Sequence, residues 1–196
     1  METIWFYAQL GFNHVLDFQG LDHFYFIIAL AIPFGFRELQ KLLWWVSLFT
    51  LGHTLSLFGN YFFELKLPAD WIEFLIPVTI ALSCIPLLRS KTFPVANWFP
   101  SLITLIFGLI HGLGFGRYFS LIVSEDEALV DLLSFALGVE AVQIFIVVGI
   151  LIINLLFLNV LKINKPRWQL VIGAMILSQA IRMIIETSPF NLFFLI

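Results

Sequence analysis

The chain has 196 residues, of which 61% are hydrophobic and only 12% charged, with a formal net charge of −3 and a mean hydropathy of +1.00. Soluble domains carry about twice that share of charged residues, and a chain this short cannot bury so large an apolar excess in one core. The composition therefore argues against a soluble globular domain. With one cysteine, Cys84, an intramolecular disulfide and a thiolate metal cluster are both excluded.

Residues 1–20 open the chain and are too short and too polar to span a bilayer. Apolar side chains such as Trp5, Phe6 and Leu10 recur along them, which predicts an interfacial helix lying on the outer membrane surface. The alternative is an irregular tail. Because no basic segment or small-residue cleavage site precedes the first long apolar run, we predict no cleavable signal peptide.

Six apolar runs follow, each approaching the length that a bilayer requires. They do not alternate polar and apolar residues with a period of two, which argues against membrane strands. The predicted fold class is therefore all-α, a polytopic membrane helix bundle forming a single transmembrane domain over residues 1–196. The fifth run is long enough to tilt or to project past the bilayer. The predicted spans are residues 21–36, 42–62, 69–88, 98–122, 129–158 and 168–185.

Basic loop residues predict the orientation, since cytoplasmic loops collect Lys and Arg. Two basic residues, Lys66 and Arg117, lie in the loops on one side of the predicted bundle. Seven lie on the other: Arg37, Lys41, Arg89, Lys91, Lys162, Lys165 and Arg167. The bias places both termini outside the cytoplasm, in a multi-pass protein of the bacterial inner (cytoplasmic) membrane.

Ionisable side chains inside the spans are the strongest functional signal, because they are costly in hydrocarbon and usually face a bundle interior. With the predicted orientation, all of them fall in the outer half or near the midplane. Imidazole is the commonest transition-metal ligand, and carboxylates complete or orient such sites. We therefore predict a site for a divalent transition metal ion (nickel, or cobalt, zinc or copper) built from His14, Asp17, Asp22, His23, His53, Glu73, His111 and Glu140.

Simpler roles compete for single residues. His14 can be an interfacial histidine, and the Asp22-His23 pair can cap a helix. His53 and His111 can be packed, hydrogen-bonded histidines. Glu140 and Arg182 are also predicted to form a buried structural ion pair that joins the fifth and sixth spans. Together these roles account less well for every histidine lying in the same half of the bilayer.

Four segments resemble the HupE/UreJ family of small bacterial membrane proteins: residues 11–24 (GFNHVLDFQGLDHF), 49–56 (FTLGHTLS), 107–115 (FGLIHGLGF) and 135–140 (FALGVE). The resemblance implies a permease-like role in uptake of nickel or a related metal, often tied to the supply of hydrogenase or urease. It carries over four positions as metal-handling: Asp22, His23, His53 and His111. Glu140 matches the family's glutamate, whereas Ala136 and Ala141 stand where the family has Asn and Gly.

The predicted function is a membrane permease that binds and passes the metal as its substrate, with the bilayer and the ion as partners. No Gly-rich phosphate loop with Lys indicates a nucleotide site, and no basic run suggests nucleic acid. One alternative is an intramembrane metal-dependent hydrolase with Glu73 or Glu140 as general base, although a His-Glu-x-x-His motif is lacking. The other is a metal-binding assembly factor of a membrane complex. A homo-oligomer or a membrane partner stays open.

Overall fold

The computed structural model describes residues 2–17, 20–65, 67–89, 98–123 and 126–190, and the side chains of 98 and 99 are not among those described. Every regular element in these ranges is helical, which confirms the predicted all-α class. The helices are α1 (Glu2–Val15), α2 (Asp22–Ala31), α3 (Leu39–Phe63), α4 (Ala69–Leu88), α5 (Trp98–Ile122), α6 (Ala128–Leu155) and α7 (Lys165–Glu186). A 3-10 turn, Phe36–Glu38, leads into α3, and a π-helical turn, Leu156–Val160, continues α6.

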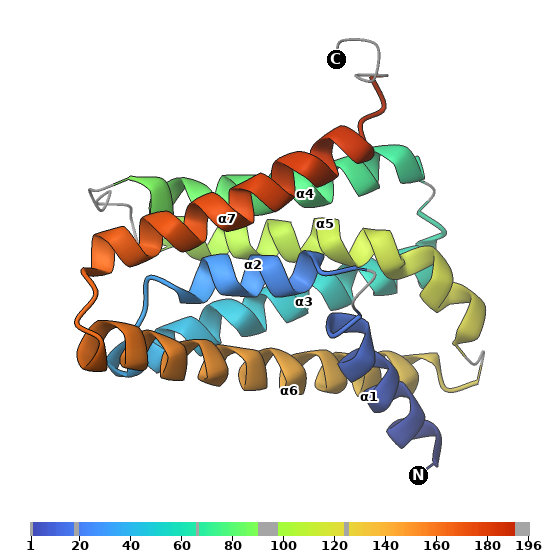
Figure 1. Ribbon diagram of the computed structural model, residues 1–196. Helices are drawn as coiled ribbons and strands as arrows, with labels where there is room; N and C mark the ends of the chain where they lie inside the picture. The colour runs from blue at the N-terminus through green and yellow to red at the C-terminus, as the bar shows by residue number, and fades with distance from the viewer. Residues whose placement is uncertain (1, 18–19, 66, 90–97, 124–125, 191–196) are drawn as a thin grey trace.

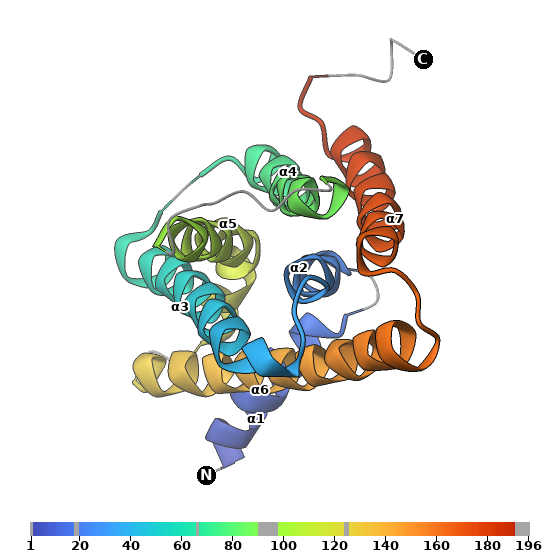
Figure 2. The ribbon, with the colours of Figure 1, turned by 90° about the vertical axis from the view of Figure 1, so that its left-hand side faces the viewer.

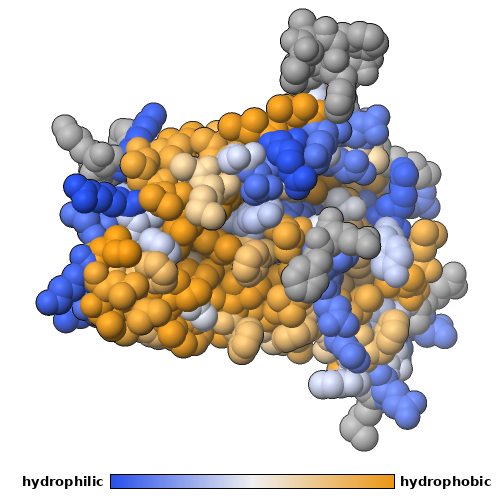
Figure 3. Space-filling model, in the orientation of Figure 1, coloured by the Kyte–Doolittle hydropathy of each residue, from blue (hydrophilic) through white to orange (hydrophobic). Residues whose placement is uncertain are grey.

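Helices α2 to α7 alternate in direction along a common axis, and the end of α7 lies at the same end of the bundle as α1 (Figure 1). Five of them, α3 to α7, are long and apolar enough to cross a membrane. Their outer faces expose large side chains such as Leu133, Phe145 and Met175. Hydrophobic residues cover most of the flank in Figure 3, with hydrophilic ones toward the two ends. The protein is thus a polytopic helical membrane bundle, and which end faces the cytoplasm stays a prediction.

Helix α2 differs from the predicted span over residues 21–36. It has ten residues, or about 15 Å at the α-helical rise per residue, which is about half the hydrocarbon thickness. Pro33, which lacks an N–H, follows its C-cap Ile32 and prevents the helix from continuing. In the view down the bundle, α2 lies at the centre, enclosed by the longer helices (Figure 2). A short helix inside a ring of full-length ones needs no lipid contact of its own.

A buried asparagine satisfies the backbone where α2 ends. Asn154 of α6 donates from Nδ2 to the carbonyl oxygens of Ile32, at 3.1 Å, and Phe34, at 3.0 Å. Its Oδ1 accepts a hydrogen bond of 2.8 Å from Nε1 of Trp168. Irregular backbone within a membrane protein is tolerated where protein groups supply the missing partners, and Asn154 supplies them here.

Glycines bring two pairs of helices into backbone contact. A Cβ on Gly138 of α6 would overlap the carbonyl oxygen of Ala8 in α1, and one on Gly11 would overlap that of Phe135. In the same way, a Cβ on Gly52 of α3 would overlap the carbonyl oxygen of Leu105 in α5. Such close packing through small residues is common between membrane helices. It fixes α1 across the start of α6, so the predicted interfacial segment is a helix docked on the bundle; its depth in a membrane stays a prediction.

Candidate metal centre

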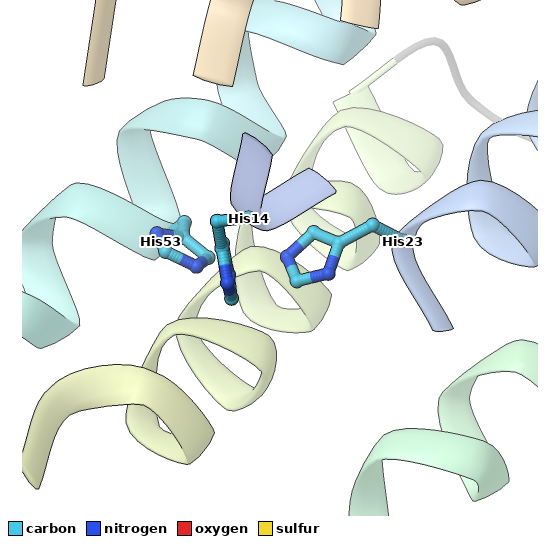
Figure 4. Close-up of side chains that lie close together, drawn as sticks. All are labelled: His14, His23 and His53. Carbon is cyan, nitrogen blue, oxygen red and sulfur yellow. The ribbon is translucent and has the colours of Figure 1, made fainter. Parts of the chain in front are cut away.

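All four histidines of the chain meet inside the bundle, each from a different helix. His14 ends α1, His23 begins α2, and His53 and His111 lie midway along α3 and α5. The ring centroids of His14 and His23 are 4.7 Å apart, those of His23 and His53 are 5.5 Å apart, and those of His23 and His111 are 5.3 Å apart. In Figure 4 the ring of His14 lies between those of His53 and His23. Residues 97 positions apart in sequence therefore share one site.

Each of these rings keeps one nitrogen buried without a hydrogen-bond partner in the described part of the chain: Nε2 of His14, His23 and His53, and Nδ1 of His111. Burying an unpartnered polar atom is costly, and native structures rarely do so without a reason. Two groups of three residues bring their ligand atoms, one from each residue, within 4.8 Å of one another. The first group is His14, His23 and His53, and the second is Asp22, His23 and His111. The two groups share His23, and each brings three ligand atoms close enough together that it could hold a metal ion.

Two neighbours fix which nitrogen of a ring is bare. Nδ1 of His23 lies 3.1 Å from Oδ1 of Asp22, and a carboxylate accepts, so Nδ1 carries the hydrogen and Nε2 is bare. Nε2 of His111 lies 2.9 Å from Oγ1 of Thr79. Because the Thr79 hydroxyl donates its single hydrogen to the carbonyl of Ile76, at 2.7 Å, the ring must donate to Thr79. Nδ1 of His111 is then the nitrogen that carries no hydrogen. The two nitrogens that carry no hydrogen, Nε2 of His23 and Nδ1 of His111, are therefore the same ones that lack a partner among the described residues.

The surroundings keep the His14 imidazole neutral. Burial lowers the pKa of His14, the neighbouring His23 lowers it further, and with Asp22 opposing them the pKa falls from 6.5 to about 3. A neutral imidazole is the form that ligates a metal ion. Aromatic rings enclose the histidines: Phe115 lies 4.1 Å from His14 between ring centroids, and Phe49 lies 5.1 Å from His111. A hydrophobic shell of this kind restricts water at a metal site.

An open pocket of about 460 Å³ reaches the cluster from the surface. Its lining includes His14 and the exposed Asp17, together with Leu10, Asn13, Phe115 and Tyr118. Asp17 therefore lies beside the route to the histidines and outside both ligand groups. His14 is the residue through which the pocket meets the buried cluster.

Two predicted site residues lie elsewhere. Glu73 is exposed on α4. Glu140 accepts hydrogen bonds from Ser47, at 2.5 Å, and from Thr50. The predicted ion pair between Glu140 and Arg182 is replaced by other contacts, since Arg182 lies 3.7 Å from Glu186 on the exposed face of its own helix. The reason is the packing of α7, which lies mainly against α4 rather than along α6.

Sequence reasoning missed several buried polar residues, among them Thr79 and Asp131. Thr79 is 2% exposed and holds His111, yet a single hydroxyl in an apolar span gives no warning of that role. Asp131 is fully buried in the first turn of α6, a position where an acid is expected merely to favour the helix N-terminus. Both are recognised only once α4 and α6 are placed against their neighbours.

The fold and the cluster define a class: a polytopic membrane protein with a buried, histidine-rich site suited to a transition metal ion. A family model described as HupE / UreJ protein matches residues 1–187. The chain belongs to this family, as the resemblance predicted, which makes it a multi-pass membrane protein related to nickel and cobalt transport. Comparisons with curated proteins and with solved structures gave no match.

Proposed function

We propose that this protein is a permease of the bacterial inner membrane. It binds a divalent transition metal ion at the histidine cluster and passes it across the bilayer, and nickel is the metal that we favour. The observation that carries the proposal is that each of the four histidines has one buried nitrogen without a partner in the described residues, and that these histidines fall in two ligand groups that share His23. A merely packed histidine has its polar atoms satisfied, whereas each of these rings has a buried nitrogen without a partner among the described residues.

The geometry supports a route with two stations. A hydrated ion enters the open pocket, where the negative charge of Asp17 attracts it, and exchanges water for His14. The first station is His14, His23 and His53, and the second is Asp22, His23 and His111. Because His23 belongs to both, an ion can move from one to the other without losing all its protein ligands. Exchange of ligands suits passage better than a closed structural site does.

The ligand set indicates the class of metal. Imidazole nitrogen with one carboxylate suits nickel, copper or zinc, and the lack of sulfur disfavours a soft monovalent ion. Cys84 is buried on α4 and bonds to the carbonyl of Ile80, so it is not a ligand here. Family membership makes nickel or cobalt the first choice among metals with similar preferences.

Metal uptake into proteoliposomes tests the proposal. The unmodified protein is expected to take up nickel, and His23→Ala, which removes the ligand shared by both stations, is expected to abolish uptake and binding. Glu73→Gln is the matched control, since Glu73 was predicted as a ligand but lies apart from the cluster. Tight nickel binding without uptake would refute the permease and favour an assembly factor. Nickel uptake that survives His23→Ala would refute the site.

A further inference from the structure

A row of polar side chains runs along α3 from the histidine cluster toward the start of that helix. Ser47, Thr50 and His53 follow one another at intervals of three residues, so each is the neighbour of the next on the helix surface. Their burial increases inward, since Ser47 is exposed, Thr50 is 7% exposed and His53 is 1% exposed. The row therefore leads from a ligand of the first metal station to the surface of the bundle.

One carboxylate faces this row from α6. Oε1 of Glu140 accepts a hydrogen bond of 2.5 Å from Ser47, and its Oε2 accepts one from Thr50. Oγ1 of Thr50 also lies 3.3 Å from the carbonyl oxygen of Val46 and 2.9 Å from Oε1 of Gln143. Oxygen atoms of two helices thus gather around Thr50. We call Ser47, Thr50 and Glu140 the oxygen cluster.

The carboxylate of Glu140 has room for a cation. It lies within a segment long and apolar enough to cross a membrane, where an ionisable group is costly and commonly marks the pathway of an ion. None of the described basic side chains forms an ion pair with it, and Arg182 pairs with Glu186 instead. A carboxylate offers about four lone-pair positions, and the two hydroxyls occupy only part of them. The remaining positions are free to bind a metal ion.

An open pocket of about 490 Å³ adjoins the oxygen cluster at the surface. Its lining residues belong to the first part of α3, at the end of the bundle opposite α1 (Figure 1). The pocket that reaches His14 is lined by α1 and therefore lies toward the other end. Nζ of Lys41 lies 5.0 Å from the ring centroid of Trp45, which holds its charge over an aromatic face. The lining is Gln40, Lys41, Leu43, Trp44 and Ser47.

We propose that the oxygen cluster is a third station for the metal ion, through which the ion leaves the histidines toward the pocket beside Ser47. The proposal rests on the proposed permease function. Thr50 precedes His53 by three residues, about 4.5 Å along the helix axis, so the second and third ligand sets follow each other closely along α3. Glu140 supplies the charge that replaces the imidazoles, and the hydroxyl oxygens of Ser47 and Thr50 supply the neutral ligands.

The kind of ligand changes along this route. Imidazole nitrogen suits nickel, whereas carboxylate and other oxygen ligands suit harder ions such as magnesium and manganese. The oxygen cluster therefore holds nickel more weakly than the histidines do. Weak binding near the pocket favours release of the ion to water. The histidines thus select the metal, and Glu140 carries it onward.

Nickel binding and nickel uptake into proteoliposomes, measured side by side, test the third station. Glu140→Gln keeps the length and hydrogen bonding of the side chain but removes its charge. It is expected to bind nickel at the histidines within a few-fold of the unmodified protein and to lose uptake. Glu186→Gln, a matched change on the exposed face of α7, is expected to keep both.

The outcomes separate this proposal from the permease itself. Unchanged uptake by Glu140→Gln would overturn the third station and leave the permease standing. Loss of nickel binding together with uptake would also overturn it, because the role of Glu140 would then be to hold the fold. No uptake by the unmodified protein would refute the permease, and the exit route with it.

Cysteine labelling in liposomes tests whether the route is open to water. With the native thiol removed by Cys84→Ala, Ser47→Cys is expected to react with a water-soluble thiol reagent present on both sides of the membrane. Leu51→Cys is the matched control, since Leu51 is 49% exposed on the same helix but lines neither pocket. It is expected to face lipid and stay unlabelled. A Ser47→Cys that reacts no faster than Leu51→Cys would overturn the route.

Discussion

Thr79 offers a sharp test of how the metal site is organised, because it is not itself a ligand. Replacing it with valine keeps the branched shape but removes the oxygen that accepts the Nε2 hydrogen of His111. The His111 ring then has a buried N–H without an acceptor, or it shifts the hydrogen to Nδ1, the nitrogen that should face the metal. Either outcome costs binding energy.

The size of the effect follows from the hydrogen bond lost. Leaving a buried donor unsatisfied costs about 1–3 kcal/mol, and each 1.4 kcal/mol changes an equilibrium constant about tenfold. Outer-shell partners of ligating histidines usually contribute about 10–100-fold to metal affinity. We therefore expect Thr79→Val to weaken nickel binding about 10–100-fold. Thr79→Ser, which keeps the hydroxyl, is expected to bind within a few-fold of the unmodified protein.

Titration calorimetry with nickel measures the affinities, and nitrogen-15 NMR of labelled histidine reports which nitrogen of His111 carries the hydrogen. The expected signature is a mixture of tautomers in Thr79→Val and a single one in Thr79→Ser. Equal affinity for the valine variant and the unmodified protein would refute the reasoning. So would an equal loss in the serine variant, because that would make the effect one of packing.

Three further predictions concern packing and pH. Asn154→Ala removes three hydrogen bonds at the end of α2 and should lower the free energy of unfolding by about 3 kcal/mol, measured by denaturant titration in detergent; a loss under about 1 kcal/mol would contradict the role of Asn154. Gly52→Ala should separate α3 from α5 and abolish nickel binding, whereas Gly149→Ala, where a Cβ meets open space, should leave it intact; equal binding by both would refute the packing argument. The pKa of His14 falls from 6.5 to about 3 on folding. As the pH falls from 6.5 toward 3, the unfolded chain therefore binds a proton at His14 that the folded chain does not, and the metal-free protein should lose stability over that range. Unfolding midpoints across that range check the sign, and a flat profile would contradict it.

The helical bundle could be predicted from composition and run length, because only helices or closed barrels satisfy backbone groups in lipid. The convergence of the histidines could be predicted in outline. An ionisable side chain costs free energy inside a membrane, and all four histidines lay in the same predicted half of the bilayer. Which histidines become neighbours could not be predicted from the sequence. It depends on Gly52 and Gly11, whose close contacts set how α3 and α1 dock, and sequence spacing alone does not reveal which helices they bring together.

Errors arose where a tertiary contact decided the outcome. The pair Glu140 and Arg182 looked plausible because the fifth and sixth spans follow each other in sequence, but α7 packs mainly against α4. The first span was predicted too long because its apolar run continues past Ala31, although Pro33 marks the break. A single proline decided the helix end, and Asn154, more than a hundred residues away, made that end tolerable.

The docking of α1 on α6 has a consequence for how the protein is made. His14 emerges early in synthesis, but the glycine contacts that hold its helix lie on a segment made more than a hundred residues later. The ligand group that contains His14 is therefore completed only after α6 has been made and α1 has docked on it.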